Sequence, residues 1–402
     1  MFSFKNKIEK NLRDAMNENI YKEYRVLIKC KKFEDNISKK ICNLKGSLIH
    51  TINSIRIISA YASSRVIERL LEFPEVEYIC FDSYAHLCGS LSVSYANGIK
   101  FPEKYKLSGK NIGIGLIDSG VYPHQDLLIP NNKIKYFLDV INNIKYPYDD
   151  NGHGTFISGI LCGSGYCSDG LFKGIAEKAN LFVIKSFNAT GKGYVSDVLL
   201  GLETLINLSE KNNIKVLCLP FEILEHNPFI NSLFKKIFNI AIGKGLTPVV
   251  PSGSNPSKED SIRGIAILDN CLTVGGLDSF KSFKDFEFSP STSIKKIKKP
   301  DLLAASVNIC SLNSDKFFIS ERNGRKLYPS KLEENYISYS GTSCSCAYIS
   351  GLCALLYEFN NNLNFKDVVS LLKMSCELKD WLKYNQGEGL VNTNTLFSKI
   401  LK

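Results

Sequence analysis

Five short apolar runs alternate with segments of helical periodicity in the middle of this chain, and this order constrains the fold more than any other feature. The runs cover residues 111–118, 180–187, 215–221, 246–253 and 270–276. Helical segments at 196–211 and 227–244 lie between them. Buried parallel strands read as continuous apolar runs, and helices connect them across both faces of the sheet. The pattern predicts an α/β domain with a mostly parallel sheet, whose active site would lie at the carboxyl ends of the strands.

The N-terminal part of the chain has a different pattern. Three runs read as strands, at 24–30, 55–62 and 76–82, and helical spacing separates them. This β-α-β-α-β order predicts a small α+β domain. A stretch of small and polar residues follows, as expected of a linker. The sequence thus predicts four parts: a charged, helical lead at 1–22, a small domain at 23–82, a linker at 83–108 and the α/β domain at 109–402.

Charge raises the question of an anionic partner. The chain carries a formal net charge of +10, and its densest cluster is formed by Lys295, Lys296, Lys298 and Lys299. A basic surface could bind nucleic acid, which would make DNA retention fall steeply with salt. No nucleic-acid-binding motif accompanies the lysines, however, and a solvated loop is the favoured interpretation. We therefore expect no nucleic acid partner.

The thirteen cysteines and the apolar stretches bear on location. The cysteines are odd in number and show no zinc-ligand spacing. The N-terminus has no apolar core of a secretory signal, and no stretch approaches the roughly 18 apolar residues of a membrane span. We expect free thiols in a reducing cytoplasm and no membrane partner.

Three short segments carry the residues of an acyl-transfer site. Asp118 ends the run 111–118, His153 stands between two glycines in DDNGHGT, and Ser343 precedes an apolar helix in YSGTSCSCAYISG. A serine hydroxyl needs a base to remove its proton, an imidazole can do so near neutral pH, and a buried carboxylate orients the imidazole. Singly, each residue could only cap a helix or fill a structural position. Together, in the order Asp, His, Ser, they predict a catalytic triad.

These segments resemble the subtilase superfamily of serine peptidases over roughly residues 109–400. The aspartate segment reads SGKNIGIGLIDSGVYPHQDL, the histidine segment YDDNGHGTFISGI, and KPDLLAASVNICSL resembles the segment before the serine. The closest likeness suggested by the motifs is to the intracellular AprX-like group. The resemblance implies a subtilisin-like three-layer α/β sandwich and endopeptidase activity on peptide or protein substrates without a cofactor. Structural calcium sites vary in the family; Asp149 and Asp150 could attract a cation, but no calcium site is assignable.

The resemblance also suggests a role for the small N-terminal domain. Its pattern is similar to the ferredoxin-like subtilase propeptide, which inhibits the enzyme and assists its folding. The linker would then lie across the active site and be cut by the enzyme itself. The alternative is an unrelated small domain.

The chain departs from the family at the oxyanion site. The family has an asparagine donor in an AAGN motif, and the corresponding text here is PVVPSGSNPS. Aligning Gly253 with the family glycine puts Ser254 at the donor position, whereas a shift of one residue would place Asn255 there. By the same alignment Gly253 is expected to line the substrate cleft. Loss of one such donor typically costs about 100–1,000-fold in rate. The backbone N–H of Ser343 would remain as a second donor.

The predicted substrate cleft also departs from the family. One wall reads Leu219-Pro220-Phe221 where the family has Ser-Leu-Gly, and proline cannot donate a backbone hydrogen bond to an extended peptide. We expect a narrower cleft. The opposite wall, Gly191, Lys192 and Gly193, keeps its glycines and could pair with the peptide backbone.

Two alternatives follow from these departures. One is a pseudoprotease, a binding or scaffolding protein that keeps the fold and turns over poorly. The other is a redox-sensitive protease. It concerns Cys344 and Cys346, which follow Ser343 by one and three residues. A thiol near a helix N-terminus could have a lowered pKa and make the site redox-sensitive, although packing of small side chains is the favoured interpretation.

Overall fold

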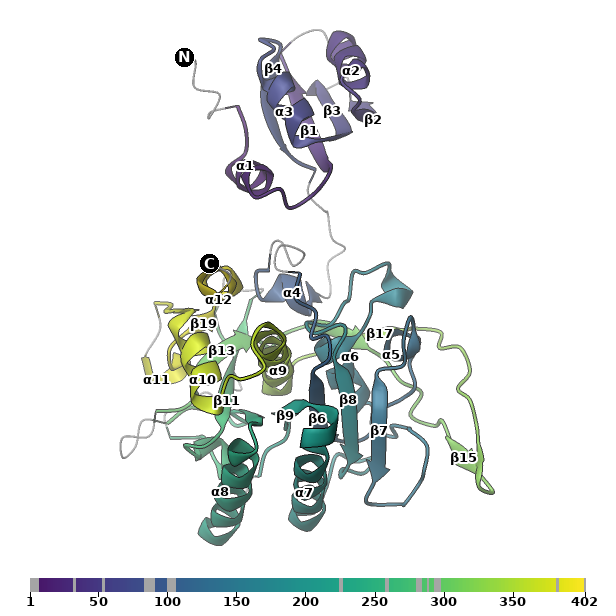
Figure 1. The fold of residues 1–402 in the computed structure, drawn as a ribbon, viewed down its shortest axis with the longest axis vertical. Helices are drawn as coiled ribbons and strands as arrows, with labels where there is room; N and C mark the ends of the chain where they lie inside the picture. Colours follow the sequence, from purple (N-terminus) through teal and green to yellow (C-terminus); the bar gives the residue numbers. More distant parts are fainter. Residues whose placement is uncertain are drawn as a thin grey trace. The chain divides into compact units, whose positions relative to one another are not determined.

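The computed structural model divides into two compact units, 1–88 and 89–402. The residues it describes are 7–31, 34–52, 55–82, 91–99, 106–223, 227–256, 260–279, 284–287, 289–292, 298–380 and 383–400. Most of the predicted linker and the lysines at 295 and 296 lie outside these ranges. The two units are described separately (Figure 1).

The first unit is a four-stranded antiparallel sheet with helices between its strands. Its elements are α1 (Lys10–Asn17), β1 (Tyr24–Cys30), α2 (Glu34–Asn43), β2 (Ser47–Ile52), β3 (Ile57–Ala62), α3 (Ser64–Leu71) and β4 (Val76–Phe81). The strand order is β2-β3-β1-β4, and β-α-β-β-α-β is the order of a ferredoxin-like fold.

Strand β2 is the element that sequence reasoning missed in this unit. It lies at the edge of the sheet, and its side chains are exposed or only half-buried, Leu48 and Ile52 included. Without a buried face, β2 lacks the alternation that marks β1, in which Tyr24, Val26 and Ile28 point into the core. The three predicted strands are present, and the predicted β-α-β-α-β order was wrong by this one strand.

The larger unit is built on a ten-stranded sheet, and the predicted α/β class is confirmed. Its strands are β6 (Gly113–Asp118), β7 (Ile134–Asp139), β8 (Asn180–Lys185), β9 (Ile214–Cys218), β10 (Thr247–Pro251), β11 (Leu272–Asp278), β12 (Lys284–Asp285), β13 (Leu302–Ala305), β18 (Cys376–Glu377) and β19 (Leu390–Val391). The order is β18-β19-β13-β11-β10-β9-β6-β8-β7, with β12 beside β11. Only β12 and β18 run antiparallel to their neighbours.

Helices cover both faces of this sheet, which makes three layers. On one face lie α7 (Val195–Asn212) and α8 (Pro228–Gly243), which pack together in Figure 1. On the other face lie α6 (His153–Cys162) and α9 (Thr342–Phe359). Further elements are α5 (Gln125–Leu128), η4 (Tyr166–Ser168), η5 (Gly264–Ile267), β15 (Glu321–Arg322), β16 (Arg325–Lys326), α10 (Phe365–Met374), α11 (Lys383–Gln386) and α12 (Thr393–Ile400).

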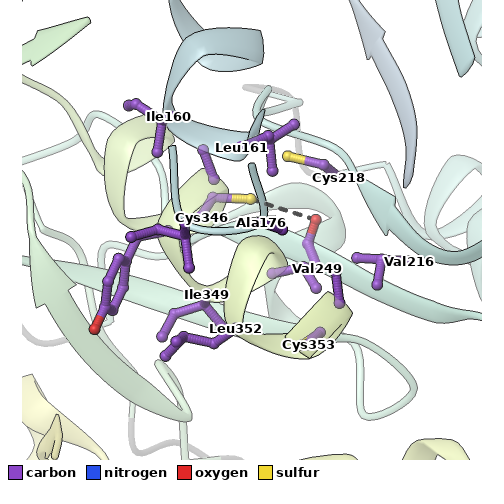
Figure 2. Close-up of a cluster of buried hydrophobic side chains, with 14 of the residues drawn as sticks. Ile160, Leu161, Ala176, Val216, Cys218, Val249, Cys346, Ile349, Leu352 and Cys353 are labelled. Carbon is purple, nitrogen blue, oxygen red and sulfur yellow. Dashed lines mark hydrogen bonds between the residues drawn. The ribbon is translucent and has the colours of Figure 1, made fainter. Parts of the chain in front are cut away.

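Helix α9 runs through the core. Its own side chains are small or apolar on every face, and nearly all of them are buried. Figure 2 shows this environment: Cys346, Ile349 and Leu352 of α9 lie among side chains of the strands and of α6. The Cys346 thiol lies 3.4 Å from the Val249 carbonyl of β10. A helix held on every side can present its N-terminal residues in one fixed position.

Part of the predicted linker has regular structure. Strand β5 (Leu91–Ser92) pairs in parallel with β14 (Ile309–Leu312), which also pairs with β17 (Tyr336–Tyr339). Helix α4 (Val93–Ala96) follows, and its Val93 and Ala96 are buried. Residues 83–90 and 100–105 lie outside the described residues, so cleavage in the linker stays a prediction.

Two further observations concern membranes and cysteines. None of the helices that the structure describes has the length and apolarity needed to cross a membrane. Twelve cysteines lie in the described ranges, and all twelve are free thiols.

Candidate active site

Asp118 and His153 form a close pair at the carboxyl end of the central strand β6. His153 Nδ1 lies 2.8 Å and 2.9 Å from the two carboxylate oxygens of Asp118. Asp118 is buried, and its Oδ1 also accepts the Ser119 N–H at 2.7 Å. Close approach of α6 to β6 depends on Gly154, since a Cβ there would collide with the Gly120 carbonyl. The pairing fixes the ring so that Nε2 is the nitrogen left for chemistry.

The environment of His153 shifts its pKa upward. Burial by itself lowers the pKa of the imidazole, but the charge and hydrogen bond of Asp118, with a further contribution from Asp149, outweigh that effect. The side chain still has 37% of its surface exposed. His153 therefore combines an oriented, basic ring with access from solvent.

A second buried carboxylate holds the turn that carries His153. Asp149 accepts the backbone N–H groups of Gly152 and Thr155, both at 2.8 Å, and the Thr155 hydroxyl at 2.6 Å. It also accepts the Ser119 hydroxyl at 2.8 Å, which links this turn to the residue after Asp118. The sequence left open whether Asp149 attracts a cation; in the structure its carboxylate accepts hydrogen bonds at the N-terminus of α6.

Asp150 has a different partner. The ammonium of Lys185, at the end of β8, lies 2.6 Å from Asp150 Oδ1. It also donates to the carbonyls of Ser119 at 2.6 Å and Phe187 at 2.9 Å. The cation beside Asp150 is thus a side chain of the protein, and it ties the ends of β6 and β8 to the His153 turn.

Ser343 occupies the second position of α9, after Gly341 and Thr342. Its backbone N–H has no carbonyl one turn earlier in the helix, so it can donate to a ligand. Its hydroxyl donates to the Pro220 carbonyl at 2.9 Å. Among the described residues, no hydrogen bond joins the Ser343 hydroxyl to His153. The Thr342 hydroxyl donates to the Gly253 carbonyl at 2.7 Å, so both residues at the start of α9 contact the predicted cleft walls.

The two candidate oxyanion donors both have partners. The Ser254 backbone N–H donates to Glu222 Oε2 at 3.0 Å, and the Ser254 hydroxyl donates to Glu222 Oε1. The Asn255 amide donates to the Ser261 carbonyl at 3.1 Å. The Ser254 hydroxyl is thus engaged by Glu222, and the assignment of the oxyanion donor to Ser254 or Asn255 stays a prediction.

The predicted substrate-binding residues 219–221 and 191–193 lie in two loops that follow strands β9 and β8, and Gly253 follows β10. Leu219 and Pro220 are buried, while Phe221 is half-buried and packs on Phe187 with ring centroids 5.2 Å apart. In the other loop, Asn188 accepts the Lys192 N–H with its side chain, and its own N–H donates to the Lys192 carbonyl at 2.9 Å.

Gly191 and Gly193 belong to the same loop. The Gly191 N–H donates to the Asn188 carbonyl at 2.9 Å, and a Cβ on Gly193 would collide with the Ser186 carbonyl. The nearby Asn151 amide, in the turn before His153, donates to the Ala189 carbonyl at 3.0 Å. This loop is therefore braced by its own hydrogen bonds and by the His153 turn.

The cysteines beside Ser343 are packing residues. Cys344 and Cys346 are buried, and burial raises the pKa of the Cys344 thiol to about 12. Burial and the neighbouring Cys218 raise the pKa of Cys346 well above its usual value. The hypothesis of a lowered thiol pKa was wrong, because desolvation outweighs the effect of the helix N-terminus.

Within the part of the chain that the structure describes, one group of residues has ligand atoms close enough to hold a metal ion. His124, Asp126 and Cys167 offer atoms within 4.8 Å of one another. Each already has a protein partner: the Asp126 N–H donates to His124 Nδ1, the Tyr336 hydroxyl donates to Asp126, and the Cys167 thiol lies 3.5 Å from Gln125. This arrangement is a satisfied hydrogen-bond network as it stands.

Sequence reasoning missed two residues of the site. Lys185 could have been suspected from a charge that ends the otherwise apolar run NLFVIK. Glu222 gives a weaker signal: it is an acidic residue directly after the predicted cleft wall. Its contact with Ser254, 32 residues later, is a product of the fold.

Comparisons with known proteins agree with the fold and the motifs. The model of the subtilase family (peptidase S8) matches residues 109–393. Serine protease AprX of Bacillus subtilis (strain 168) is 30% identical over 298 residues, which cover 71% of this chain and 66% of that protein. Subtilisin DY of Bacillus licheniformis is 25% identical over 71% of this chain and 90% of its own length.

A solved structure gives the same result for the fold. Sphericase aligns with a TM-score of 0.57 at 20% identity, over 73% of this chain and 91% of its own. The chain spans about two thirds of the AprX protease. The match to the family model, 109–393, contains all three segments predicted to carry the triad. On the family match over 109–393 and the α/β fold, this chain belongs to the subtilase family.

Proposed function

We propose that this protein is a serine endopeptidase in which Ser343 is the nucleophile, His153 the general base and Asp118 the orienting carboxylate. The Asp118–His153 pair at 2.8 Å carries this proposal, because it holds an accessible imidazole at the carboxyl end of the sheet. Peptide and protein substrates fit the serine proteases to which the chain is similar.

The first half of the reaction forms an acyl-enzyme. The Ser343 hydroxyl leaves the Pro220 carbonyl and turns to His153, whose Nε2 takes the proton as the serine oxygen attacks the peptide carbonyl. Hydrogen bonds of this kind often form only when substrate is bound. The imidazolium, stabilised by Asp118, then protonates the departing amine as the C–N bond breaks. In the second half, His153 takes a proton from a water molecule as the water attacks the acyl-enzyme ester, and it returns the proton to the departing Ser343 oxygen.

The small N-terminal unit is proposed to be an intramolecular inhibitor and folding aid. Its β-α-β-β-α-β order and antiparallel sheet support this interpretation, since they agree with the ferredoxin-like fold expected of a subtilase propeptide.

A cytoplasmic location is proposed from the many free thiols.

A pseudoprotease is the second candidate function. The observation in its favour is the oxyanion region, where Ser254 is bound to Glu222 and Asn255 to Ser261. A site in which the Ser254 hydroxyl stays bound to Glu222 would lack that donor and turn over slowly. The intact Asp118–His153 pair favours the enzyme.

Labelling with a fluorophosphonate separates the two. We expect wild type to be labelled at Ser343, Ser343→Ala to remain unlabelled, and His153→Ala to react far more slowly. Mass spectrometry of the labelled peptide identifies the site. A folded wild type, or its processed form, that leaves Ser343 unlabelled would refute the enzyme and favour a binding role.

A further inference from the structure

The Glu222 carboxylate lies beside two segments that contact the first residues of α9, where Ser343 stands. Glu222 follows the segment of Pro220, whose carbonyl accepts the Ser343 hydroxyl at 2.9 Å. Ser254 follows Gly253, whose carbonyl accepts the Thr342 hydroxyl at 2.7 Å. The Glu222 side chain bridges these segments through its contacts with Ser254.

The bridge fills the space over Gly253. A Cβ built on Gly253 would lie 2.6 Å from Glu222 Oε2 and 3.4 Å from Pro290. The carboxylate therefore rests on the face of a residue that the sequence predicts to line the substrate cleft. The buried ring of Pro290 also lies over this face of Gly253.

The structure shows no basic side chain paired with Glu222 in the ranges that it describes. Among the described residues, no lysine, arginine or histidine lies within ion-pair distance of it, and the hydrogen bonds it accepts come from the neutral Ser254. The residue is only half-buried, so a ligand can reach it. A carboxylate held this way beside an apolar surface suits a long side chain with a cationic end, such as lysine or arginine.

The same bridge affects catalysis. While the Ser254 hydroxyl donates to Glu222, it cannot donate to the oxyanion that forms at the substrate carbonyl. A negative charge beside that oxyanion would also oppose its formation. Productive binding requires another partner for Glu222, and a cationic substrate side chain provides one.

We propose that Glu222 determines specificity: it pairs with a lysine or arginine on the acyl side of the scissile bond, and this pairing frees the Ser254 hydroxyl for the oxyanion. The inference rests on the proposed peptidase activity and names its substrate class. Glu222 is then a substrate-binding residue in its own right and a switch for the second oxyanion donor.

Matched peptides test this pairing on the full chain. One pair differs only in lysine or norleucine before the scissile bond, and the other only in arginine or citrulline, so each pair differs mainly in charge. Values of kcat/KM are normalised to the Ser343 labelled by fluorophosphonate. Wild type should favour each cationic peptide by at least about tenfold, which corresponds to about 1.4 kcal/mol.

Substitution of Glu222 should remove this preference. Glu222→Gln should bring both ratios within about threefold of unity, because the neutral amide forms no ion pair. Glu203→Gln is the matched control, since Glu203 is exposed on α7 and should leave both ratios unchanged. Equal turnover of the two peptides by wild type, or an unchanged preference in folded Glu222→Gln, would overturn the inference.

A measurement on wild type alone guards against a misfolded variant. Benzamidine, a cationic mimic of an arginine side chain, should slow labelling of Ser343 at concentrations where neutral benzamide does not. Equal effects of the two compounds would also overturn the inference. A labelled enzyme without cation preference refutes only this inference, whereas an unlabelled Ser343 with no hydrolysis refutes the proposed function and the inference with it.

Discussion

The Lys185 ammonium, on a side chain fully shielded from solvent, lies 2.6 Å from an Asp150 carboxylate oxygen. The same nitrogen caps the carbonyl of Ser119, next to Asp118, and the carbonyl of Phe187. Two strand ends and the His153 turn thus share one buried cation, so stability and catalytic geometry depend on the same group.

Replacing this lysine should lower both stability and rate. Lys185→Met leaves the Ser119 and Phe187 carbonyls without their donor, and each unsatisfied buried group costs about 1–3 kcal/mol. We expect the free energy of unfolding, measured by urea denaturation, to fall by about 2–5 kcal/mol. Lys211→Met, on the exposed side of α7, is the control and should change little. A Lys185→Met protein as stable as the control would contradict the structural role.

The raised pKa of His153 predicts the pH dependence of activity. The general base must be neutral, so kcat/KM should rise with pH through a pKa above the ordinary 6.5. Asp118→Asn removes the charge that raises the pKa, so this limb should move to lower pH while kcat falls by about ten-thousand-fold. Profiles of kcat/KM with a small ester substrate measure both effects. If the rising part of the profile stays at the same pH in Asp118→Asn, the Asp118 charge is not what raises the pKa of His153.

The same shift predicts the pH dependence of stability. Because the folded pKa of His153 is above the unfolded one, the charged ring contributes stability below the unfolded pKa, and this contribution is lost as pH rises through the folded pKa. We compare two inactive proteins, Ser343→Ala and the double variant Ser343→Ala with His153→Gln. As pH rises through this range, Ser343→Ala should lose more stability than the double variant, which lacks the imidazole. Thermal unfolding at several pH values tests the difference.

The two candidate oxyanion donors should respond differently to truncation. We expect Ser254→Ala to lower kcat by up to about 100-fold on a substrate that displaces Glu222, since it removes the hydroxyl next to Gly253. Asn255→Ala should lower stability by about 1 kcal/mol and leave kcat nearly unchanged, because its amide serves the Ser261 carbonyl. A large loss of kcat in Asn255→Ala alone would assign the oxyanion to Asn255.

Self-processing is predicted if the N-terminal unit is a propeptide. Intact mass of purified wild type should reveal cleavage within 83–100, and Ser343→Ala should remain whole. His153→Ala serves as a second inactive protein. Cleavage that also occurs in both inactive variants would point to another protease, and an uncut wild type would remove the prediction of self-cleavage.

Local sequence patterns were sufficient for most of the fold. The buried strands β6, β8, β9, β10 and β11 and the helices α7 and α8 lie where continuous apolar runs and helical periodicity predict them. Strand β2 escaped, because an edge strand with no buried face has no such pattern. For the site, Asp118 and His153 were predictable as a pair because each stands in a short motif and the chain order Asp, His, Ser is that of a catalytic triad.

What the sequence by itself determined was the α/β class, the family and the identity of the proposed triad, since these depend on short motifs and on periodic burial. Only the tertiary structure decided the partners of individual polar groups: Lys185 with Asp150, Ser254 with Glu222, and Asn255 with Ser261. It also decided that the thiols beside Ser343 are buried with raised pKa values, because the surrounding core desolvates them. Such contacts join residues far apart in the chain, so no local pattern encodes them.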